Sequence, residues 1–517
     1  MNGARSLLDT LMANGVDVCF ANPGTSEMHF VAALDQVDGM RCVLGLFEGV
    51  VTGAADGYAR MADRPAATLL HLGPGLANGL SNLHNAMRAH SPIVNVIGDH
   101  ATYHRLYDAP LTSDIEGTAR PFSHWVRTSP TADTVAGDAA AAVAAARTAP
   151  GRIASLILPA DAAWSPVSRE SAAPVRAIVP PTRKPADETI EAVAEILRSS
   201  KNTGIVLGPS ATREGPLALA GKIAGATGAR LFAPTHIARI SRGAGRVPVH
   251  RLPYPVDQAL DTLRDLDNLI LVGAKAPVAF FAYPDKPSQL VQPGTHVHEL
   301  ARPDEDTGYA LRALVDALDA THAAAPSIEL ATPARPDGTL TPAKIGALLG
   351  ALLPEQAIVV DESITTGRTF LDDTRTAPPH DWILGTGGAI GYALPCATGA
   401  AIACPDRKTI ALESDGSGMY MPQALWTHAR EGLNILTLVF ANHRYQILRG
   451  EMANVGATRK GANADALLNI DNPRIDWVSQ ARTFGIEAFR AETAGELARH
   501  LEAGLAVQGP CLIEVAC

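Results

Sequence analysis

The most informative residues in this chain are a carboxylate and a carboxamide that each follow an apolar segment. Asp415 stands after the apolar residues 409–412, and Asn442 stands after the apolar residues 435–440. Both segments have the composition of buried strands, and the apolar residues of 417–431 between them recur at helical spacing. A strand–helix–strand unit of this kind places both side chains at the carboxyl edge of one parallel sheet, where α/β proteins bind ligands.

The chemistry that suits these two side chains is the binding of Mg²⁺ together with a diphosphate. Mg²⁺ prefers oxygen ligands in octahedral geometry and commonly shares them with phosphates. Asp415, Asn442 and the backbone carbonyl of Arg444 would supply three protein oxygens. The N–H groups of Gly416 and Ser417, at the start of a helix, would suit the anion. For Asp415 taken alone, an ordinary helix N-cap is the alternative interpretation.

Two further ionisable side chains lie at predicted element boundaries in the N-terminal part of the chain. Glu48 follows an apolar stretch and begins the predicted helix 48–61. Its carboxyl could share a proton with a ring nitrogen of a cofactor, or it could be a first-turn acid favoured by the helix dipole. His71 precedes a glycine-rich turn at 73–79, where an imidazole can transfer protons. For an isolated histidine, a hydrogen-bonded core position is the more common outcome.

Two loops could approach a cofactor. Residues 21–27 form a tight turn in which Thr25 offers a hydroxyl at the sheet edge, or caps the next helix. Residues 385–391 are rich in glycine and precede the predicted helix 392–403. Their backbone could approach a flat ring, with Ile390 wedged between the two rings of a bent cofactor or packed into the core.

The elements that must position these residues alternate between strand-like and helix-like segments. The expected strands, besides those beside Asp415 and Asn442, are 16–20, 67–71, 93–97, 155–158, 203–207, 230–232, 269–272 and 511–515, and the expected helices in the first block are 4–14, 48–61 and 79–88. This alternation implies parallel sheets. Proline-rich stretches near 168–186 and 320–342 separate three blocks. We therefore predict an α/β fold of three doubly wound parallel-sheet domains, at 1–167, 187–320 and 341–517.

Composition narrows the class of protein. A chain of 517 residues with 47% hydrophobic and 19% charged residues is expected to fold into two to four domains and not to be disordered. A net charge of −10 argues against a nucleic-acid partner. No apolar run has the length of a membrane span, and the first residues do not resemble a signal peptide. The six cysteines show no C-x-x-C pattern, which favours reduced thiols and a cytoplasmic location.

Together, these motifs resemble the thiamine diphosphate-dependent decarboxylase and carboligase family, which includes acetolactate synthase, pyruvate decarboxylase and benzoylformate decarboxylase. The resemblance extends over essentially the whole chain. It is greatest to benzoylformate decarboxylase and to acetolactate synthase-like large subunits. It implies that 1–167 is a pyrimidine-binding domain, 187–320 a middle domain and 341–517 a diphosphate-binding domain.

The resemblance implies thiamine diphosphate and Mg²⁺ as cofactors and assigns roles to the residues above. Glu48 would contact the aminopyrimidine ring nitrogen, Ile390 would hold the cofactor in a bent shape, and the Gly388 carbonyl would accept a hydrogen bond from the exocyclic amine. The diphosphate would be anchored through the metal ligands proposed above. Thr25 and the shorter middle block argue against FAD.

The implied substrate is a 2-oxo acid that loses CO₂. Thr25 corresponds to a turn hydroxyl that meets the substrate carboxylate in benzoylformate decarboxylase, and His71 corresponds to one of its proton-transfer histidines. Phe280 and Phe281 stand where its second histidine would fall. We expect this drier pocket to favour carboligation to an aldehyde or a second 2-oxo acid.

Three alternatives remain open at this point. One is simple decarboxylation that releases an aldehyde, and another is a non-catalytic cofactor-binding paralogue. A nicotinamide-dependent dehydrogenase is disfavoured, because the glycine spacing at 73–79 is one residue too long for a dinucleotide fingerprint. The resemblance also implies a homodimer or homotetramer in which the pyrimidine-binding domain of one subunit meets the diphosphate-binding domain of another.

Overall fold

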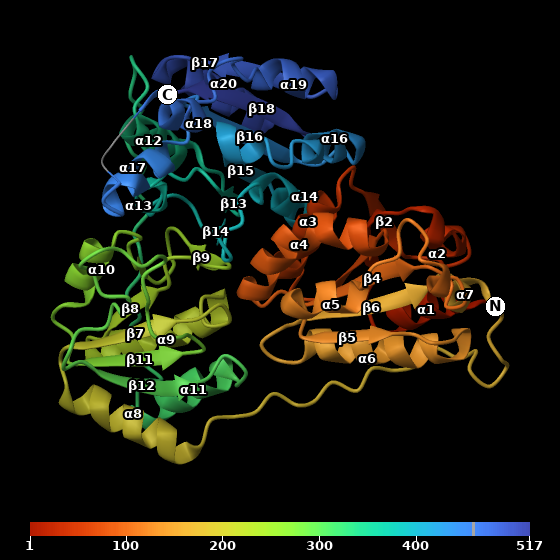
Figure 1. The fold of residues 1–517 in the computed structure, drawn as a ribbon. Coiled ribbons are helices and arrows are strands. Elements are labelled where there is room, and N and C mark those ends of the chain that lie inside the picture. Colours follow the sequence, from red (N-terminus) through yellow and green to blue (C-terminus); the bar gives the residue numbers. More distant parts are fainter. Residues whose placement is uncertain (458–460) are drawn as a thin grey trace.

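The computed structural model describes residues 1–457 and 461–517, which form three α/β units around three sheets (Figure 1). The strand orders are β2-β1-β3-β4-β6-β5, β10-β8-β7-β11-β12 and β17-β18-β16-β15-β13-β14-β9. Neighbouring strands pair in parallel throughout, apart from the antiparallel pair of β14 and β9. The predicted α/β fold class with three parallel-sheet units is therefore confirmed.

The strands are β1 (Val18–Asn22), β2 (Arg41–Leu44), β3 (Ala66–Leu70), β4 (Ile93–Asp99), β5 (Trp125–Thr128), β6 (Ile153–Pro159), β7 (Thr203–Leu207), β8 (Arg230–Ala233), β9 (Ile240–Arg242), β10 (His250–Arg251), β11 (Asn268–Val272), β12 (His296–Ala301), β13 (Ile358–Asp361), β14 (His380–Leu384), β15 (Thr409–Ser414), β16 (Ile435–Ala441), β17 (Glu487–Ala491) and β18 (Cys511–Ala516). Central strands such as β3, β4, β6 and β16 are buried along their whole length. This burial explains their continuous apolar runs, because helices cover both faces of a parallel sheet.

The α-helices are α1 (Gly3–Ala13), α2 (Met28–Leu34), α3 (Glu48–Ala62), α4 (Leu72–Ala89), α5 (Ile115–Ala119), α6 (Val135–Arg147), α7 (Ala160–Trp164), α8 (Asp187–Ser199), α9 (Glu214–Thr227), α10 (Val256–Leu263), α11 (Thr307–Ala317), α12 (Pro342–Leu352), α13 (Phe370–Asp373), α14 (Ala393–Ala403), α15 (Asp415–Gly418), α16 (Gln423–Arg430), α17 (Gln446–Asn454), α18 (Ala462–Leu468), α19 (Trp477–Thr483) and α20 (Ala494–Ala506). Short 3₁₀ turns occur at η1 (Thr25–Glu27), η2 (Arg105–Tyr107), η3 (Arg120–Phe122) and η4 (Ala132–Thr134).

Two predicted elements were wrong. The predicted helix 417–431 is two helices, α15 and α16, separated near Pro422, because proline cannot continue a helix through its own position. The predicted turn at 73–79 is part of α4, which begins at Leu72 and not at residue 79. Its glycines serve close packing, since a Cβ on Gly73 would lie 2.0 Å from the Ser113 hydroxyl. The other expected elements end within about two residues of the observed ones, which is the ordinary uncertainty of boundaries.

One strand departs from the simple division into three ranges. β9 lies within the predicted middle range, yet Arg242 pairs antiparallel with His380 of β14 in the third sheet. The connections around 168–186 and 320–342 are largely irregular, and the first is the long extended segment between α7 and α8 in Figure 1. The limits 1–167, 187–320 and 341–517 stay a prediction.

The first and third units are joined by two helices that approach closely. A Cβ on Gly57 of α3 would lie 1.9 Å from the carbonyl oxygen of Cys396 in α14. Conversely, a Cβ on Gly399 of α14 would lie 1.8 Å from the carbonyl oxygen of Ala54. Residues of both units share one hydrophobic core cluster around these helices. This contact sets the relative position of the two units that carry the predicted site residues.

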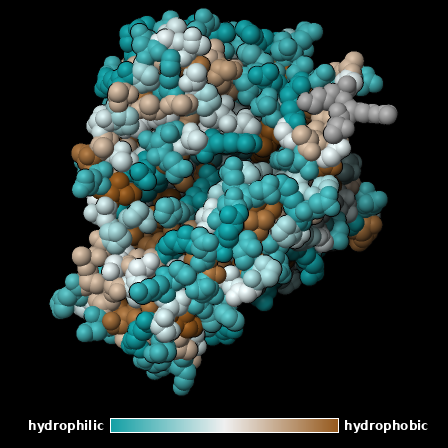
Figure 2. Space-filling view, turned by 90° about the vertical axis from the view of Figure 1, so that its left-hand side faces the viewer, coloured by the Kyte–Doolittle hydropathy of each residue, from teal (hydrophilic) through white to brown (hydrophobic). Residues whose placement is uncertain are grey.

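The surface is mixed in character. On the face drawn in Figure 2, hydrophilic residues predominate and hydrophobic residues form scattered patches. In the described ranges, we find no helix with both the length and the apolar character needed to cross a membrane.

Candidate active site

Asp415 and Asn442 emerge at the carboxyl ends of two adjacent strands. β15 and β16 pair in parallel and end at Ser414 and Ala441, so Asp415 and Asn442, which follow these strand ends, lie at the same edge of the sheet. The backbone N–H of His443 donates a hydrogen bond of 2.5 Å to Asp415 Oδ2. The structure therefore brings this pair together, as the sequence predicts.

Asp415 is a carboxylate in need of a cation. The residue is only 1% exposed. Burial raises the pKa of Asp415 to about 6, although the backbone N–H groups of His443 and Gly416 act in the opposite direction. His443 Nδ1 lies 3.8 Å away, but burial lowers the pKa of this imidazole, which is neutral at pH 7. A divalent cation beside Asp415 would supply the missing positive charge, so the residues present fit a bound metal.

The turn after Asn442 is tightly constrained. Asn442 Oδ1 accepts a hydrogen bond of 3.0 Å from the backbone N–H of Arg444. His443 between them has a φ of 56°, in the left-handed region that few non-glycine residues adopt. Such strain is common at functional sites. In the described part of the chain, no group of three or more His, Cys, Asp or Glu could hold a metal ion. Asp415 and Asn442 offer a carboxylate oxygen and an amide oxygen, which are ligand types that Mg²⁺ accepts when a ligand's phosphates complete its shell.

Gly416 and Ser417 lie in the single helical turn α15. A Cβ on Gly416 would lie 2.5 Å from the Tyr445 ring, so a larger residue there would require this ring to move. The Ser417 hydroxyl donates to Glu413 and, at 3.3 Å, to the Ser414 carbonyl. This hydroxyl is thus engaged by its neighbours.

The glycine-rich loop before α14 is held in an unusual backbone shape. Gly388 and Gly391 have φ values of 76° and 86°, which favour glycine. The loop ends at the N-terminus of α14, where the Glu362 carboxylate accepts hydrogen bonds of 2.8 Å from the N–H groups of Gly391 and Tyr392. Ile390, which directly precedes these anchored residues, is half-buried.

Asn85 of α4 holds the same loop from the first unit. Its Nδ2 donates to the Ala389 carbonyl at 2.8 Å, and its Oδ1 accepts from the N–H groups of Gly387 and Ala389, each at 3.2 Å. Sequence reasoning missed both Asn85 and Glu362. Their partners are far away in the sequence, so no local pattern marks them.

Phe280 and Phe281 lie beside this loop. A Cβ on Gly388 would lie 2.6 Å from Phe280 Cζ. The two phenylalanine rings pack edge to face with centroids 4.8 Å apart, and the residues are 40% and 54% exposed. His236, which the sequence did not single out, packs against Phe280 at 4.9 Å and places Nδ1 2.8 Å from the Gly385 carbonyl.

Glu48 is the first residue of α3 and is buried. Asn78 Nδ2 donates a hydrogen bond of 3.0 Å to Glu48 Oε2. A Cβ on Gly75 would lie 2.9 Å from Glu48 Oε1 and 3.3 Å from His71 Cβ. The first turns of α4 therefore bring Glu48 and His71 to the same place, which sequence spacing alone could not show.

His71 is held by a residue that the sequence analysis overlooked. Its Nδ1 lies 2.8 Å from Glu27 Oε2, which also accepts a 2.7 Å hydrogen bond from the N–H of Gly24. Burial raises the pKa of Glu27, while the bonds from Gly24 and His71 act to lower it. Leu72, next to His71, has a φ of 48°, a further strained position. Thr25 is exposed beside this pair.

These residues form two separate groups within one chain. The first group surrounds Glu48 and His71, and the second surrounds Asp415 and Asn442. Over residues 1–457 and 461–517, no hydrogen bond or ion pair links these four side chains across the two groups.

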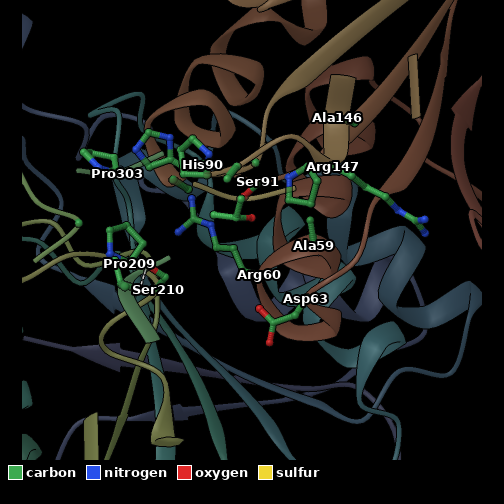
Figure 3. Close-up of a pocket in the computed structure, with 18 of the residues that line it drawn as sticks. Ala59, Arg60, Asp63, His90, Ser91, Ala146, Arg147, Pro209, Ser210 and Pro303 are labelled. Atoms are coloured by element: carbon green, nitrogen blue, oxygen red, sulfur yellow. Dashed lines mark hydrogen bonds between the residues drawn. The ribbon is translucent and has the colours of Figure 1, made fainter. Parts of the chain in front are cut away.

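A large cavity lies away from both groups. It measures about 720 Å³ and opens between the first and middle units, where Arg60, His90 and Ser91 face Pro209 and Ser210 (Figure 3). It contains none of the residues predicted to carry chemistry.

Comparison with protein families gives two matches. Residues 1–118 match the thiamine pyrophosphate enzyme, N-terminal TPP binding domain, and residues 367–515 match the corresponding C-terminal TPP binding domain. The matches include the segments that carry Glu48 and Asp415.

Relatives match over nearly the whole chain. A Mycobacterium tuberculosis protein named as a candidate acetolactate synthase large subunit, IlvX, is 51% identical over 100% of this chain and 99% of its own length. Benzoylformate decarboxylase of Pseudomonas aeruginosa is 29% identical over 98% of this chain and 97% of its own. The structure of Rhodococcus jostii thiamine diphosphate-dependent 4-hydroxybenzoylformate decarboxylase superimposes with a TM-score of 0.88, at 25% identity, over 100% of this chain and 99% of that chain.

Proposed function

The chain belongs to the thiamine pyrophosphate enzyme family, and from this premise we propose that it is a Mg²⁺-dependent 2-oxo acid decarboxylase that transfers the acyl unit to a second carbonyl compound. The observation that carries this proposal is the buried carboxylate of Asp415 beside Asn442 at the carboxyl edge of the third sheet. Thiamine diphosphate, when bound, supplies the nucleophilic carbon and accepts the electrons released with CO₂.

In this proposal, the third unit anchors the diphosphate. Mg²⁺ would be held by Asp415, Asn442 and the Arg444 carbonyl. The backbone N–H groups of Gly416 and Ser417 would lie against the diphosphate. Ile390 and the Gly388 carbonyl orient the aminopyrimidine end. The bonds from Glu362 and Asn85 to the loop support this role, because they fix its backbone before any ligand binds.

The first unit performs the proton chemistry. Glu48 holds a proton at the aminopyrimidine ring nitrogen, and its burial supports this role by keeping water away from that contact. Thr25 meets the substrate carboxylate. His71 moves a proton at the substrate-derived carbon, with Glu27 fixing its ring.

We further propose a homodimer or homotetramer in which the Glu48 group of one subunit completes the Asp415 group of another. The lack of a direct link between these groups in the described chain supports this arrangement. So does the exposed apolar segment after β4, where Tyr103, Leu106 and Tyr107 are 61%, 72% and 69% exposed. We propose a cytoplasmic location, on the basis of the free cysteines.

The fate of the acyl unit depends on the pocket wall. Phe280 and Phe281 present an apolar surface beside the glycine-rich loop, which supports carboligation to an aldehyde or 2-oxo acid. Simple decarboxylation is the second candidate, since relatives in sequence and structure are named benzoylformate and 4-hydroxybenzoylformate decarboxylases.

The test is a panel of 2-oxo acids incubated with the full chain, thiamine diphosphate and Mg²⁺, with and without acceptor aldehydes. Mass spectrometry would measure CO₂, aldehyde and acyloin products. Acyloin formation supports carboligation, and aldehyde release alone supports the second candidate. Absence of turnover with every 2-oxo acid, in protein that binds the cofactor, would indicate a non-catalytic paralogue.

A further inference from the structure

A second cavity, of about 310 Å³, lies where the three units meet. Its lining comes from the end of α3, from the middle unit and from the third sheet, and comprises Asp63, Arg213, Glu214, Gly215, Arg239, Ser241, Arg246, Gln356, His380, Asp381 and Arg407. Asp63 and Arg213 also line the larger cavity, where Asp63 is drawn below Arg60 in Figure 3. No residue of the proposed active site lines it, so its occupancy is a separate question from catalysis.

Arginines outnumber carboxylates around this cavity. The four arginines are Arg213, Arg239, Arg246 and Arg407, and the three acids are Asp63, Glu214 and Asp381. His380 adds no charge, because burial lowers its pKa to about 3. Asp381 already accepts hydrogen bonds from two guanidinium groups, from Arg239 Nε at 2.9 Å and from Arg407 Nη2 at 2.7 Å.

Arg213 is the cation with the weakest compensation. Its Nη2 lies 3.0 Å from Asp63, a carboxylate that is 60% exposed and that Arg239 shares at 3.4 Å. Its Nη1 is buried and has no hydrogen-bond partner within the described residues. Burial, with repulsion from Arg239, lowers the pKa of Arg213 to about 10, so the group stays charged at neutral pH. A buried, charged donor of this kind calls for an acceptor.

The N-terminus of α9 opens at the same place. Arg213 occupies its N-cap position, and no side chain caps the first turn. A cation here opposes the usual preference for an acceptor or an anion at the positive end of a helix. Glu214 and Gly215 bring the first backbone N–H groups of this 14-residue helix to the cavity. Arg213 Nη1, which has no partner among the described residues, and the uncapped helix N-terminus therefore both lack an acceptor, which an anion would supply.

We propose that this junction binds a phosphoryl group, either as free phosphate or as a phosphate monoester, held by Arg213 and by the first N–H groups of α9. Arg246 lies at the same cavity, and its ion-pair partner among the described residues is the exposed carboxylate of Glu214. Because all three units line the cavity, a bound phosphoryl group stabilises their packing against one another.

The test is calorimetric and thermal titration of the full chain with inorganic phosphate, glycerol phosphate and malonate, at ionic strength held constant with chloride. We expect saturable binding of phosphate or its monoester and a melting temperature that rises to a plateau. Arg213→Met should weaken binding at least about tenfold, the loss expected for a charged hydrogen bond. Arg264→Met, at an exposed arginine paired only with Asp261, is the matched control.

A second variant keeps the proposal testable if Arg213→Met does not fold. A Cβ on Gly215 would meet nothing within 4 Å, so Gly215→Asp should place a second carboxylate, beside that of Glu214, in the first turn of α9. It should raise the melting temperature without phosphate and abolish phosphate binding. The proposal is overturned by binding of malonate alone, by absence of saturable phosphoryl binding, or by unchanged binding in Gly215→Asp. If only one of inorganic phosphate and glycerol phosphate binds, the result shows whether the site takes free phosphate or a phosphate monoester.

Discussion

Replacing Glu27 by glutamine should separate activity from stability. Glu27 is 3% exposed. Its Oε2 forms hydrogen bonds with His71 Nδ1, at 2.8 Å, and with the backbone N–H of Gly24, at 2.7 Å. The fit is close, because a Cβ on Gly98 would lie 1.5 Å from Glu27 Oε1. A carboxamide of the same size fits this space, and its oxygen in the position of Oε2 can accept both bonds, but this oxygen is uncharged, so both bonds are weaker.

The magnitude follows from the hydrogen bonds. A bond to a charged group contributes about 1.5–3 kcal/mol, so Glu27→Gln should lower kcat by roughly 10- to 150-fold if His71 must keep its orientation in the transition state. KM should change much less, since Glu27 does not reach the substrate. The shape of the pH profile of kcat should also change, because the partner of the His71 ring is no longer ionisable.

The thermal stability of Glu27→Gln should stay the same or rise, although its kcat falls. Burial raises the pKa of Glu27 above its unfolded value, so its protonated form is favoured in the folded state. The corresponding stability is fully present below the unfolded pKa and is lost as pH rises through the folded pKa. Glutamine cannot ionise, so the variant does not lose stability as the pH rises. It should therefore unfold at an equal or higher temperature than the parent at pH 7 to 8.

The assay is kcat and KM against pH with the best substrate of the panel, together with thermal unfolding and cofactor affinity. Glu170→Gln, at an exposed position, is the matched control. A Glu27→Gln enzyme with kcat within twofold of the parent would refute the positioning role. A variant that loses stability and cofactor binding together would show that Glu27 is only a structural residue.

Three other perturbations test the remaining parts of the site and fold. Glu48→Gln should leave Mg²⁺ and cofactor affinity nearly unchanged but slow turnover by orders of magnitude, as loss of general acid–base catalysis costs about 10²–10⁴-fold; near-normal turnover would remove Glu48 from the mechanism. Asp415→Ala should abolish Mg²⁺-dependent retention of thiamine diphosphate on a desalting column, and holoenzyme that still forms at ordinary Mg²⁺ would show that the metal lies elsewhere. Gly57→Ala should destabilise the chain by about 1–3 kcal/mol through overpacking against Cys396, measured by denaturant unfolding, and an unchanged midpoint would contradict the close contact of α3 with α14.

Much of the architecture was accessible from local patterns. Strands such as β15 and β16 were recognisable because buried parallel strands are continuous apolar runs. Helix α16 was misjudged because apolar spacing continues across Pro422. The glycines at 73–79 were interpreted as a turn, since glycine has low helix propensity. Tertiary packing overrides that propensity where small residues are needed against Ser113 and Glu48.

The amino-acid sequence by itself determined the kinds of chemistry available to this protein. The order of strands and helices puts Asp415 and Asn442 at one sheet edge, because consecutive parallel strands end on the same side. Motif types along the chain likewise singled out Glu48, His71 and the loop around Ile390 as candidates, whose roles stay predictions.

Only the tertiary structure decided which groups tune that chemistry. Glu27, Asn85 and Glu362 act through contacts with residues from other elements, and the pKa of Asp415 depends on burial that several elements produce together. The same holds for Arg213, whose ion pair with Asp63 and whose Nη1, unpartnered among the described residues, arise where three units converge. Hydrogen bonding and desolvation depend on distances in space, which local sequence patterns do not encode.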